Sequence, residues 1–139
     1  MSSRYIFVSA RRCRPLTVPR GEGIGPLALL ACPPGELHEL GLVAFGLVLR
    51  ERGWRIAYVG ADTPPGDIAA TLDVLSPAIV VLAAVTPERF LDSADEVREL
   101  ASHSRVGLAG AGASSSLARE LKAESLAGGL VDVAEALTP

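Results

Sequence analysis

The chain has 139 residues, of which 49% are hydrophobic, and its mean hydropathy is +0.35. It is therefore long and apolar enough to form one domain with a buried core, which excludes a disordered protein. The net charge of −3 and the isoelectric point near 5.4 give no general reason to bind nucleic acid.

Residues 1–25 are basic, and we expect them to form a flexible arm. Five of the 13 basic residues lie in the first 20 positions, which contain no acidic residue. The apolar run YIFV is too short for a secretory signal, and no run approaches the ~18 residues of a membrane span. An Arg- and Ser-rich start also fits an organelle transit segment, although no other feature supports that interpretation. Cys13 and Cys32 show no metal-site spacing, so we expect reduced thiols in a cytoplasmic protein.

From residue 26 onward, short apolar runs alternate with stretches that have helical periodicity. The pattern predicts strands at 27–32, 54–60, 78–85 and 105–110, and a short fifth strand early in 125–137. Helices are predicted at 40–52, from 65, from 87 and from 114, and at the end of 125–137. We therefore predict one α/β domain over residues 26–139. Its doubly wound, five-stranded parallel sheet has the order 2-1-3-4-5, as in flavodoxin-like or Rossmann-like folds.

In such a sheet, ligands bind beyond the carboxyl ends of the strands, where the strand order reverses. That point lies between the first and third predicted strands, so the loop at 33–39 is the first candidate site. Glu36 in this loop would repel a flavin phosphate, and no GxGxxG pattern follows the first strand. The third strand ends in Ala83, Ala84 and Val85, where a phosphoacceptor receiver needs an acidic residue.

The remaining candidate in this loop is His38, between Glu36 and Glu39. Imidazole is the commonest metal ligand, and a carboxylate often binds the proton on its second nitrogen, a role open to either glutamate. One imidazole does not hold a bare metal ion, but it can be an axial ligand to a metal in a macrocycle. Gly41, without a side chain, would let a flat ligand approach the helix. A solvated surface histidine remains the alternative interpretation.

Small residues stand at the carboxyl ends of several predicted strands. They are Gly60, Ala83, Ala84, Gly110, Ala111 and Gly112. Tight packing of helices on the sheet explains any one of them. Together they would leave a slot into which a narrow, planar group could fit.

The stretch Glu36-Leu37-His38-Glu39-Leu40-Gly41 resembles the DxHxxG signature of cobalamin-binding domains, with Glu in place of Asp. With LRERGWRIAYVGADTP, it is closest to the C-terminal domain of cobalamin-dependent MerR-type regulators, and the similarity extends from about Leu27 to Ala136. The resemblance implies that His38 is the lower axial ligand of cobalt and that the displaced nucleotide tail enters the slot. It implies adenosylcobalamin or methylcobalamin as the cofactor. The implied cofactor-binding residues are Glu36, Leu37, His38, Gly41, Leu42, Ala83, Val85, Thr86, Gly110, Ala111 and Gly112.

The chain departs from this family in two respects. Many members have a Ser or Thr near the end of the third strand to bind the tail, where this chain has Ala83 and Ala84. The regulators also carry a helix-turn-helix domain and a helical bundle that covers the corrin, and residues 1–25 are too few to form either. We therefore expect no nucleic-acid binding by this chain alone, and a protein partner or a homo-oligomer over the upper corrin face.

The expected function is a non-enzymatic cobalamin-binding module that senses the cofactor or presents it to a partner. No acid–base pair faces the predicted corrin, so we expect no catalysis by this chain. One alternative is the small cobalamin-binding subunit of a mutase or methyltransferase, with the chemistry on another chain. The other is a structural or interaction domain that keeps the fold without the cofactor, which the absence of the strand hydroxyl would allow.

Overall fold

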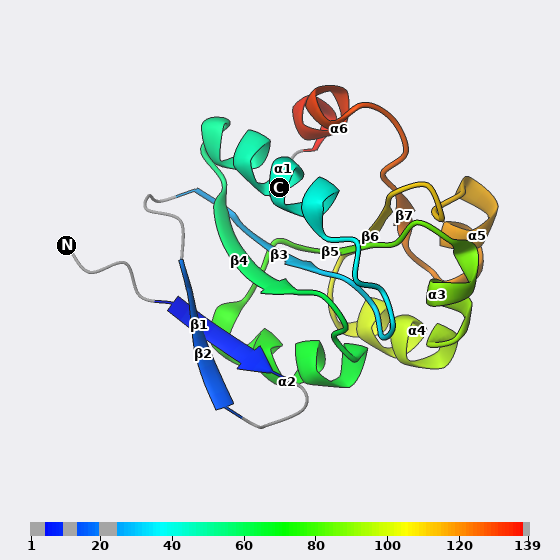
Figure 1. Ribbon diagram of the computed structural model, residues 1–139, viewed down its shortest axis with the longest axis horizontal. Coiled ribbons are helices and arrows are strands. Elements are labelled where there is room, and N and C mark those ends of the chain that lie inside the picture. The colour runs from blue at the N-terminus through cyan, green and yellow to red at the C-terminus, as the bar shows by residue number, and fades with distance from the viewer. Residues whose placement is uncertain (1–4, 10–13, 20–24, 138–139) are drawn as a thin grey trace.

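The computed structural model describes residues 5–9, 14–19 and 25–137. The centre of the molecule is a five-stranded parallel sheet with the spatial order β4-β3-β5-β6-β7 (Figure 1). Its strands are β3 (Leu27–Ala31), β4 (Arg55–Gly60), β5 (Ile79–Ala83), β6 (Val106–Ala109) and β7 (Glu124–Ser125). Numbered along the chain, this is the order 2-1-3-4-5, so the predicted fold class is confirmed. The order reverses between β3 and β5.

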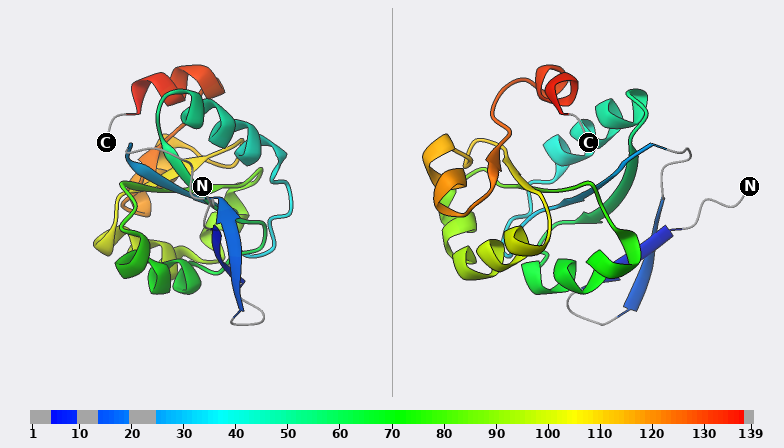
Figure 2. Two further views of the ribbon diagram at one scale, coloured as in Figure 1. Left: turned by 90° about the vertical axis from the view of Figure 1, so that its left-hand side faces the viewer. Right: turned by 180° about the vertical axis from the view of Figure 1, so that it is seen from behind.

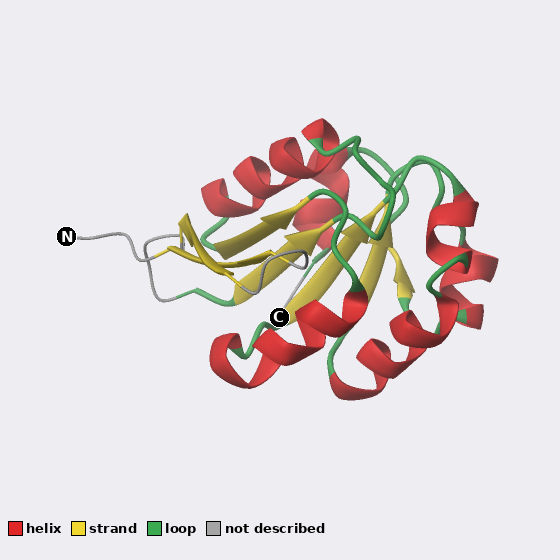
Figure 3. Cartoon of the chain, turned by 60° about the horizontal axis from the view of Figure 1, so that its bottom comes forward, coloured by secondary structure: helices red, strands yellow, loops and turns green. Residues whose placement is uncertain are grey.

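Helices cover both faces of the sheet, as Figures 2 and 3 show. One face is covered by α1 (Leu40–Glu51) and α6 (Leu130–Ala136). The other is covered by α2 (Pro65–Leu75), α3 (Pro87–Leu91), α4 (Ala94–His103) and α5 (Ser115–Glu120). The predicted strands and helices are thus all present, with ends shifted by a few residues.

The core consists of two layers because successive strand side chains point to opposite faces. In β3, Ala28 and Leu30 pack on the α1 side, while Leu27, Leu29 and Ala31 pack on the α2 side. All five residues of β3 are buried, which explains why its sequence is apolar throughout rather than alternating.

The helix predicted from residue 87 is in fact two helices, α3 and α4. The chain leaves helical geometry at Ser93, which has φ −121° and ψ 28°. The Ser93 N–H donates to the Phe90 carbonyl at 3.2 Å, and the Ser93 carbonyl accepts the Val97 N–H at 2.9 Å. This turn redirects the chain while Phe90 and Val97 both remain fully buried.

The N-terminal region contains regular structure that its composition did not indicate. Strands β1 (Tyr5–Ser9) and β2 (Arg14–Pro19) pair antiparallel, and this hairpin lies beside β4. The boundary at residue 25 and the flexibility of the arm stay predictions, and Cys13 lies outside the described residues. In the part of the chain that the structure describes, no helix combines the length and apolarity needed to cross a bilayer.

Candidate functional site

Glu36 connects the loops that follow three neighbouring strands. Its side chain is only 1% exposed, and Oε2 accepts the backbone N–H of Val85, after β5, at 2.9 Å. Its backbone carbonyl accepts the N–H of Asp62, after β4, at 3.0 Å. Because Glu36 itself follows β3, one residue holds together the loops on both sides of the point where the strand order reverses.

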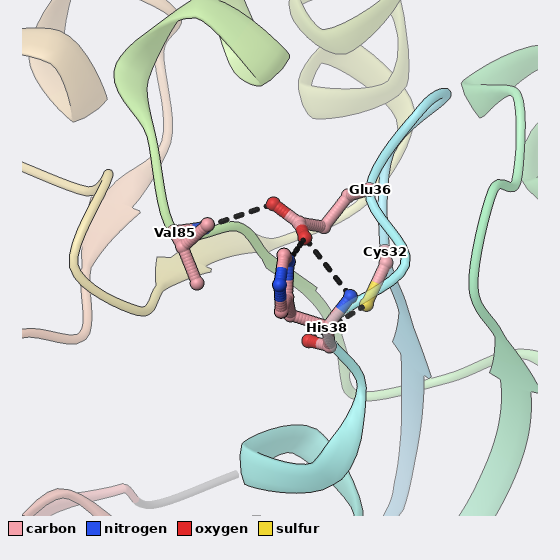
Figure 4. Close-up of polar contacts among 4 residues, drawn as sticks. All are labelled: Cys32, Glu36, His38 and Val85. Carbon is pink, nitrogen blue, oxygen red and sulfur yellow. Dashed lines mark hydrogen bonds and ion pairs between the residues drawn. The ribbon is translucent and has the colours of Figure 1, made fainter.

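The second carboxylate oxygen of Glu36 positions His38 (Figure 4). Oε1 accepts the backbone N–H of His38 at 3.0 Å and lies 2.8 Å from Nδ1 of its ring. The imidazole is nevertheless 75% exposed. Both the position of the backbone and the orientation of the ring are therefore fixed by one buried group, while the rest of the ring faces outward.

The charge state of Glu36 determines which tautomer His38 adopts. Burial opposes ionisation of Glu36, but the N–H groups of Val85 and His38, together with the His38 ring, outweigh it and lower the pKa of this carboxyl below 4.5. An ionised carboxylate only accepts hydrogen bonds, so Nδ1 of His38 is the donor. In the neutral imidazole this leaves the lone pair on Nε2, which has no hydrogen-bond partner among the described residues.

Glu39, the other candidate partner of His38, has a different role. Its Oε2 accepts the backbone N–H of Ala61 at 2.9 Å, which connects the start of α1 to the loop after β4. Burial, reinforced by Glu39, raises the pKa of Tyr58, so that phenol stays protonated. Of the two glutamates that the sequence left open, Glu36 is therefore the one that binds the imidazole.

Cys32 is a free thiol beneath this loop. Burial and the carboxylates of Glu36 and Glu39 raise the pKa of Cys32 to about 12. Its Sγ lies 3.9 Å from the His38 carbonyl oxygen, as Figure 4 shows. Cys32 is therefore a buried, protonated thiol that packs against the loop from below.

A cavity of about 530 Å³ opens beside His38, between the sheet, α1 and the C-terminal segment. The lining residues are Leu37, His38, Glu39, Leu40, Gly41, Leu42, Phe45, Ala83, Ala84, Val85, Ala109, Gly110, Leu126, Gly128, Leu130 and Val133. At its mouth Leu37 and Leu40 are exposed, while Leu42, Phe45 and Ala84 line it as buried residues. The protein's own side chains leave this space open.

Most of the site residues predicted from the sequence meet at this cavity. They are Leu37, His38, Gly41, Leu42, Ala83, Val85 and Gly110, with Glu36 directly behind His38. Thr86, Ala111 and Gly112 are not among the lining residues.

Two of the predicted glycines have a packing role. A side chain at Gly110 would come within 2.4 Å of the Ala84 carbonyl oxygen, and one at Gly112 within 2.3 Å of the Thr86 backbone. Gly110 also has φ +89°, a conformation that favours glycine. The absence of side chains here lets the loop after β6 lie directly against the loop after β5.

The wall formed by Leu126, Gly128, Leu130 and Val133 was not predicted as part of the site. This segment reaches the cavity because β7 adds to the edge of the sheet, where the Leu126 N–H donates to the Leu108 carbonyl at 2.8 Å. The only sequence signal was the apolar character of these residues, which a packed core would explain equally well. Phe45 and Ala109 were missed for the same reason.

The donor set determines what the site can hold. Within the described ranges, no three His, Cys, Asp or Glu side chains gather as a metal site would require. His38 can therefore contribute one bond to a metal whose other ligands arrive with it. A Cβ atom built at Gly41 would meet no atom within 4 Å, so the start of α1 leaves space for a flat group to approach.

Residues 26–136 match the family model of the B12 binding domain. Over 69 residues, or 48% of this chain and 24% of the relative, the sequence is 44% identical to the HTH-type transcriptional repressor CarA of Myxococcus xanthus. The match therefore spans about a quarter of the length of that curated relative.

Two solved structures share the fold. A cobalamin-binding protein from Desulfitobacterium hafniense aligns with a TM-score of 0.68 and 20% identity. The alignment covers 80% of this chain and 57% of the chain of that protein. A chain of the methanol:cobalamin methyltransferase complex MtaBC from Methanosarcina barkeri aligns with a TM-score of 0.71 and 14% identity. The alignment covers 86% of this chain and 46% of that one. With the family match over most of its length, the chain belongs to the B12 binding domain family.

Proposed function

We propose that this chain is a cobalamin-binding module in which Nε2 of His38 is the lower axial ligand of cobalt. The observation that carries the proposal is the Glu36–His38 pair. A buried carboxylate holds Nδ1 at 2.8 Å, and the opposite nitrogen points its lone pair outward beside an open cavity. A carboxylate behind a metal-binding imidazole fixes its tautomer and raises its basicity, which supports this role.

The surroundings of His38 suit a corrinoid with a displaced nucleotide tail. Gly41 leaves room for the flat macrocycle, and the cavity beside it is where the tail would enter. When bound, the cofactor would supply a cobalt–carbon bond, and we propose adenosylcobalamin or methylcobalamin. The cavity of about 530 Å³ favours this function over a cofactor-free structural domain, because a concave, mostly apolar pocket with few polar groups is typical of a ligand site.

The mouth of the cavity supports the proposal of a partner. Leu37 is 69% exposed and Leu40 is 82% exposed, and both line the cavity. They therefore form an exposed apolar patch at its opening. We propose that a protein partner, or another copy of the chain, covers the upper face of the bound corrin. The module itself is proposed to be non-catalytic.

A second candidate function rests on the same exposed leucines, Leu37 and Leu40. These side chains would equally suit contact with the enzyme chain of a cobalamin-dependent mutase or methyltransferase. The module would then carry the cofactor for chemistry on that chain. Co-purification from native cell extract with a catalytic chain that turns over only when this module is present would favour this candidate.

The proposal is tested by mixing the purified protein with hydroxocobalamin and separating the free cofactor by gel filtration. We expect the cofactor to elute with the protein, with a visible spectrum shifted from that of free hydroxocobalamin because an imidazole has replaced its benzimidazole. A colourless protein peak at micromolar concentrations would show that the proposal is wrong.

Replacing Gly41 with leucine separates binding from folding. A Cβ at this position has open space, and leucine is a better helix former than glycine by less than the ~0.8–1 kcal/mol that separates alanine from glycine, so the fold should be at least as stable as wild type. The new side chain would stand where the macrocycle lies, so we expect at least tenfold weaker hydroxocobalamin binding by titration. The matched control is Gly66→Leu in α2, which also has open space but lies on the opposite face of the sheet and should bind as wild type. Equal affinity of both variants would contradict the proposed position of the corrin.

A further inference from the structure

We propose that the cavity selects corrinoids by the polarity of their lower base. It would favour an apolar aromatic base, such as dimethylbenzimidazole or a methylated phenol, over a purine. This inference rests on the proposed function, because it assumes that the displaced base occupies the cavity beside His38.

The first argument is the chemistry of the lining side chains. Of the 16 described residues that line the cavity, only His38 and Glu39 have polar side chains. His38 is oriented by Glu36, and Glu39 binds the Ala61 N–H. All other lining residues are aliphatic, aromatic or glycine, so no hydroxyl or amide side chain lines the cavity to pair with a polar base.

Several backbone groups at the end of β5 are also occupied. The N–H of Ala84 donates to the Ala109 carbonyl at 3.1 Å, and the Ala84 carbonyl accepts the Gly112 N–H at 3.0 Å. The N–H of Val85 is bound by Glu36. The backbone at the ends of β5 and β6 therefore offers a buried base few free hydrogen-bonding groups.

A purine would consequently lose hydrogen bonds to water without regaining them. Adenine has an exocyclic amine and several acceptor nitrogens, and leaving even one such buried group unpaired lowers affinity substantially. Dimethylbenzimidazole leaves only the one acceptor nitrogen that had bound cobalt, and the cresol ring leaves none. Burial of their benzene rings and methyl groups beside Leu42, Phe45 and Val133 is favourable. We expect the difference in affinity to be about tenfold or more.

Tyr58, on the α1 side of the sheet, is a polar group that could oppose this preference. Its hydroxyl is buried and has no hydrogen-bond partner among the described residues. It is not part of the cavity lining, and the ring packs with the α1-side core. A base in the cavity would meet side chains of Phe45 and Leu42 from that side instead.

The test is a titration of the purified protein with four corrinoids, read by visible absorption and calorimetry. They are cobalamin, its adenine analogue, its p-cresol analogue, and cobinamide, which lacks the nucleotide. Free cobalamin and its adenine analogue are first titrated with acid, so that the free energy of displacing the base from cobalt is subtracted. The cresol analogue and cobinamide have no base bound to cobalt and need no such correction. Benzimidazole binds cobalt more strongly than adenine does, so the uncorrected comparison works against the expected result.

We expect cobalamin and the cresol analogue to bind about tenfold or more tightly than the adenine analogue after this correction, with cobinamide weakest. Equal or tighter binding of the adenine analogue would overturn the inference. Equal binding of all four would also overturn it, because it would show that the cavity does not take the base. Binding of none would instead contradict the proposed function itself.

A matched pair of variants tests whether α6 contributes to the preference. Val133→Thr replaces a lining methyl with a hydroxyl, whereas Val131→Thr makes the same change at a residue of α6 that is 51% exposed and outside the lining. We expect the ratio of the affinities for cobalamin and its adenine analogue to fall several-fold in Val133→Thr. In Val131→Thr the ratio should stay at the wild-type value. If both variants kept the wild-type affinity ratio, the proposal that the base contacts α6 at Val133 would be contradicted.

Discussion

Replacing His38 with alanine is expected to abolish the spectral shift of bound hydroxocobalamin and to lower its affinity by more than 100-fold. Removal of a group that only supports a metal ligand typically lowers affinity by about 10–100-fold, and removal of the ligand itself should exceed that. The fold should persist, because the His38 side chain is 75% exposed and fills no part of the core. Titration followed at the visible bands of the corrinoid measures both effects.

The matched control for this variant is His103→Ala in α4. His103 is also exposed and also lies near a glutamate, with Nε2 3.1 Å from Oε1 of Glu99. It is remote from the cavity, so this variant should bind as wild type. A His38→Ala protein that kept the wild-type spectrum and affinity would disprove the axial bond, whatever else remained bound.

Replacing Glu36 with glutamine is expected to have the largest effect on stability. Three donors point at the two carboxylate oxygens: the Val85 N–H, the His38 N–H and Nδ1 of His38. The amide nitrogen of glutamine cannot accept a hydrogen bond, so at least one donor is left facing another donor. Such a buried, unpaired group should lower the free energy of unfolding by about 2–3 kcal/mol, measured by urea denaturation.

The same substitution should weaken cofactor binding about 10–100-fold. If the amide nitrogen faces Nδ1 of His38, the ring must carry its proton on Nε2, and the lone pair needed by cobalt is lost. A destabilised variant that bound hydroxocobalamin with unchanged affinity would show that Glu36 supports only the fold. Glu96→Gln, an exposed change in α4, should alter neither property.

The stabilising effect of Glu36 should also depend on pH. Because the pKa of Glu36 is lower in the folded protein than its ordinary value of 4.5, the ionised group stabilises the fold fully above that value. The contribution is lost as the pH falls through the folded pKa. The difference in unfolding free energy between wild type and Glu36→Gln should therefore shrink as the pH falls below 4.5. A difference that grew in that range would contradict the buried, ionised state.

The sequence alone predicted the fold class and the position of the proposed cobalt ligand. Strands such as 27–31 are buried on both faces, so their apolar character is continuous and visible without a structure. Alternation of such strands with helices leaves few arrangements, and the strand order places the first loop at the point of reversal. His38 and Glu36 were found in this way because they are two residues apart in one loop.

Only the tertiary structure decided which carboxylate binds His38 and what surrounds it. Glu36 and Glu39 both lie within two residues of His38, but the Val85 and Ala61 N–H groups that distinguish them come from the loops after two other strands. The cavity wall at Leu126–Val133 likewise depends on β7 joining the far edge of the sheet. Local patterns report which face of a helix or strand is apolar. They do not report which distant segment covers that face or leaves it open, because long-range contacts are set by the packing of the whole chain.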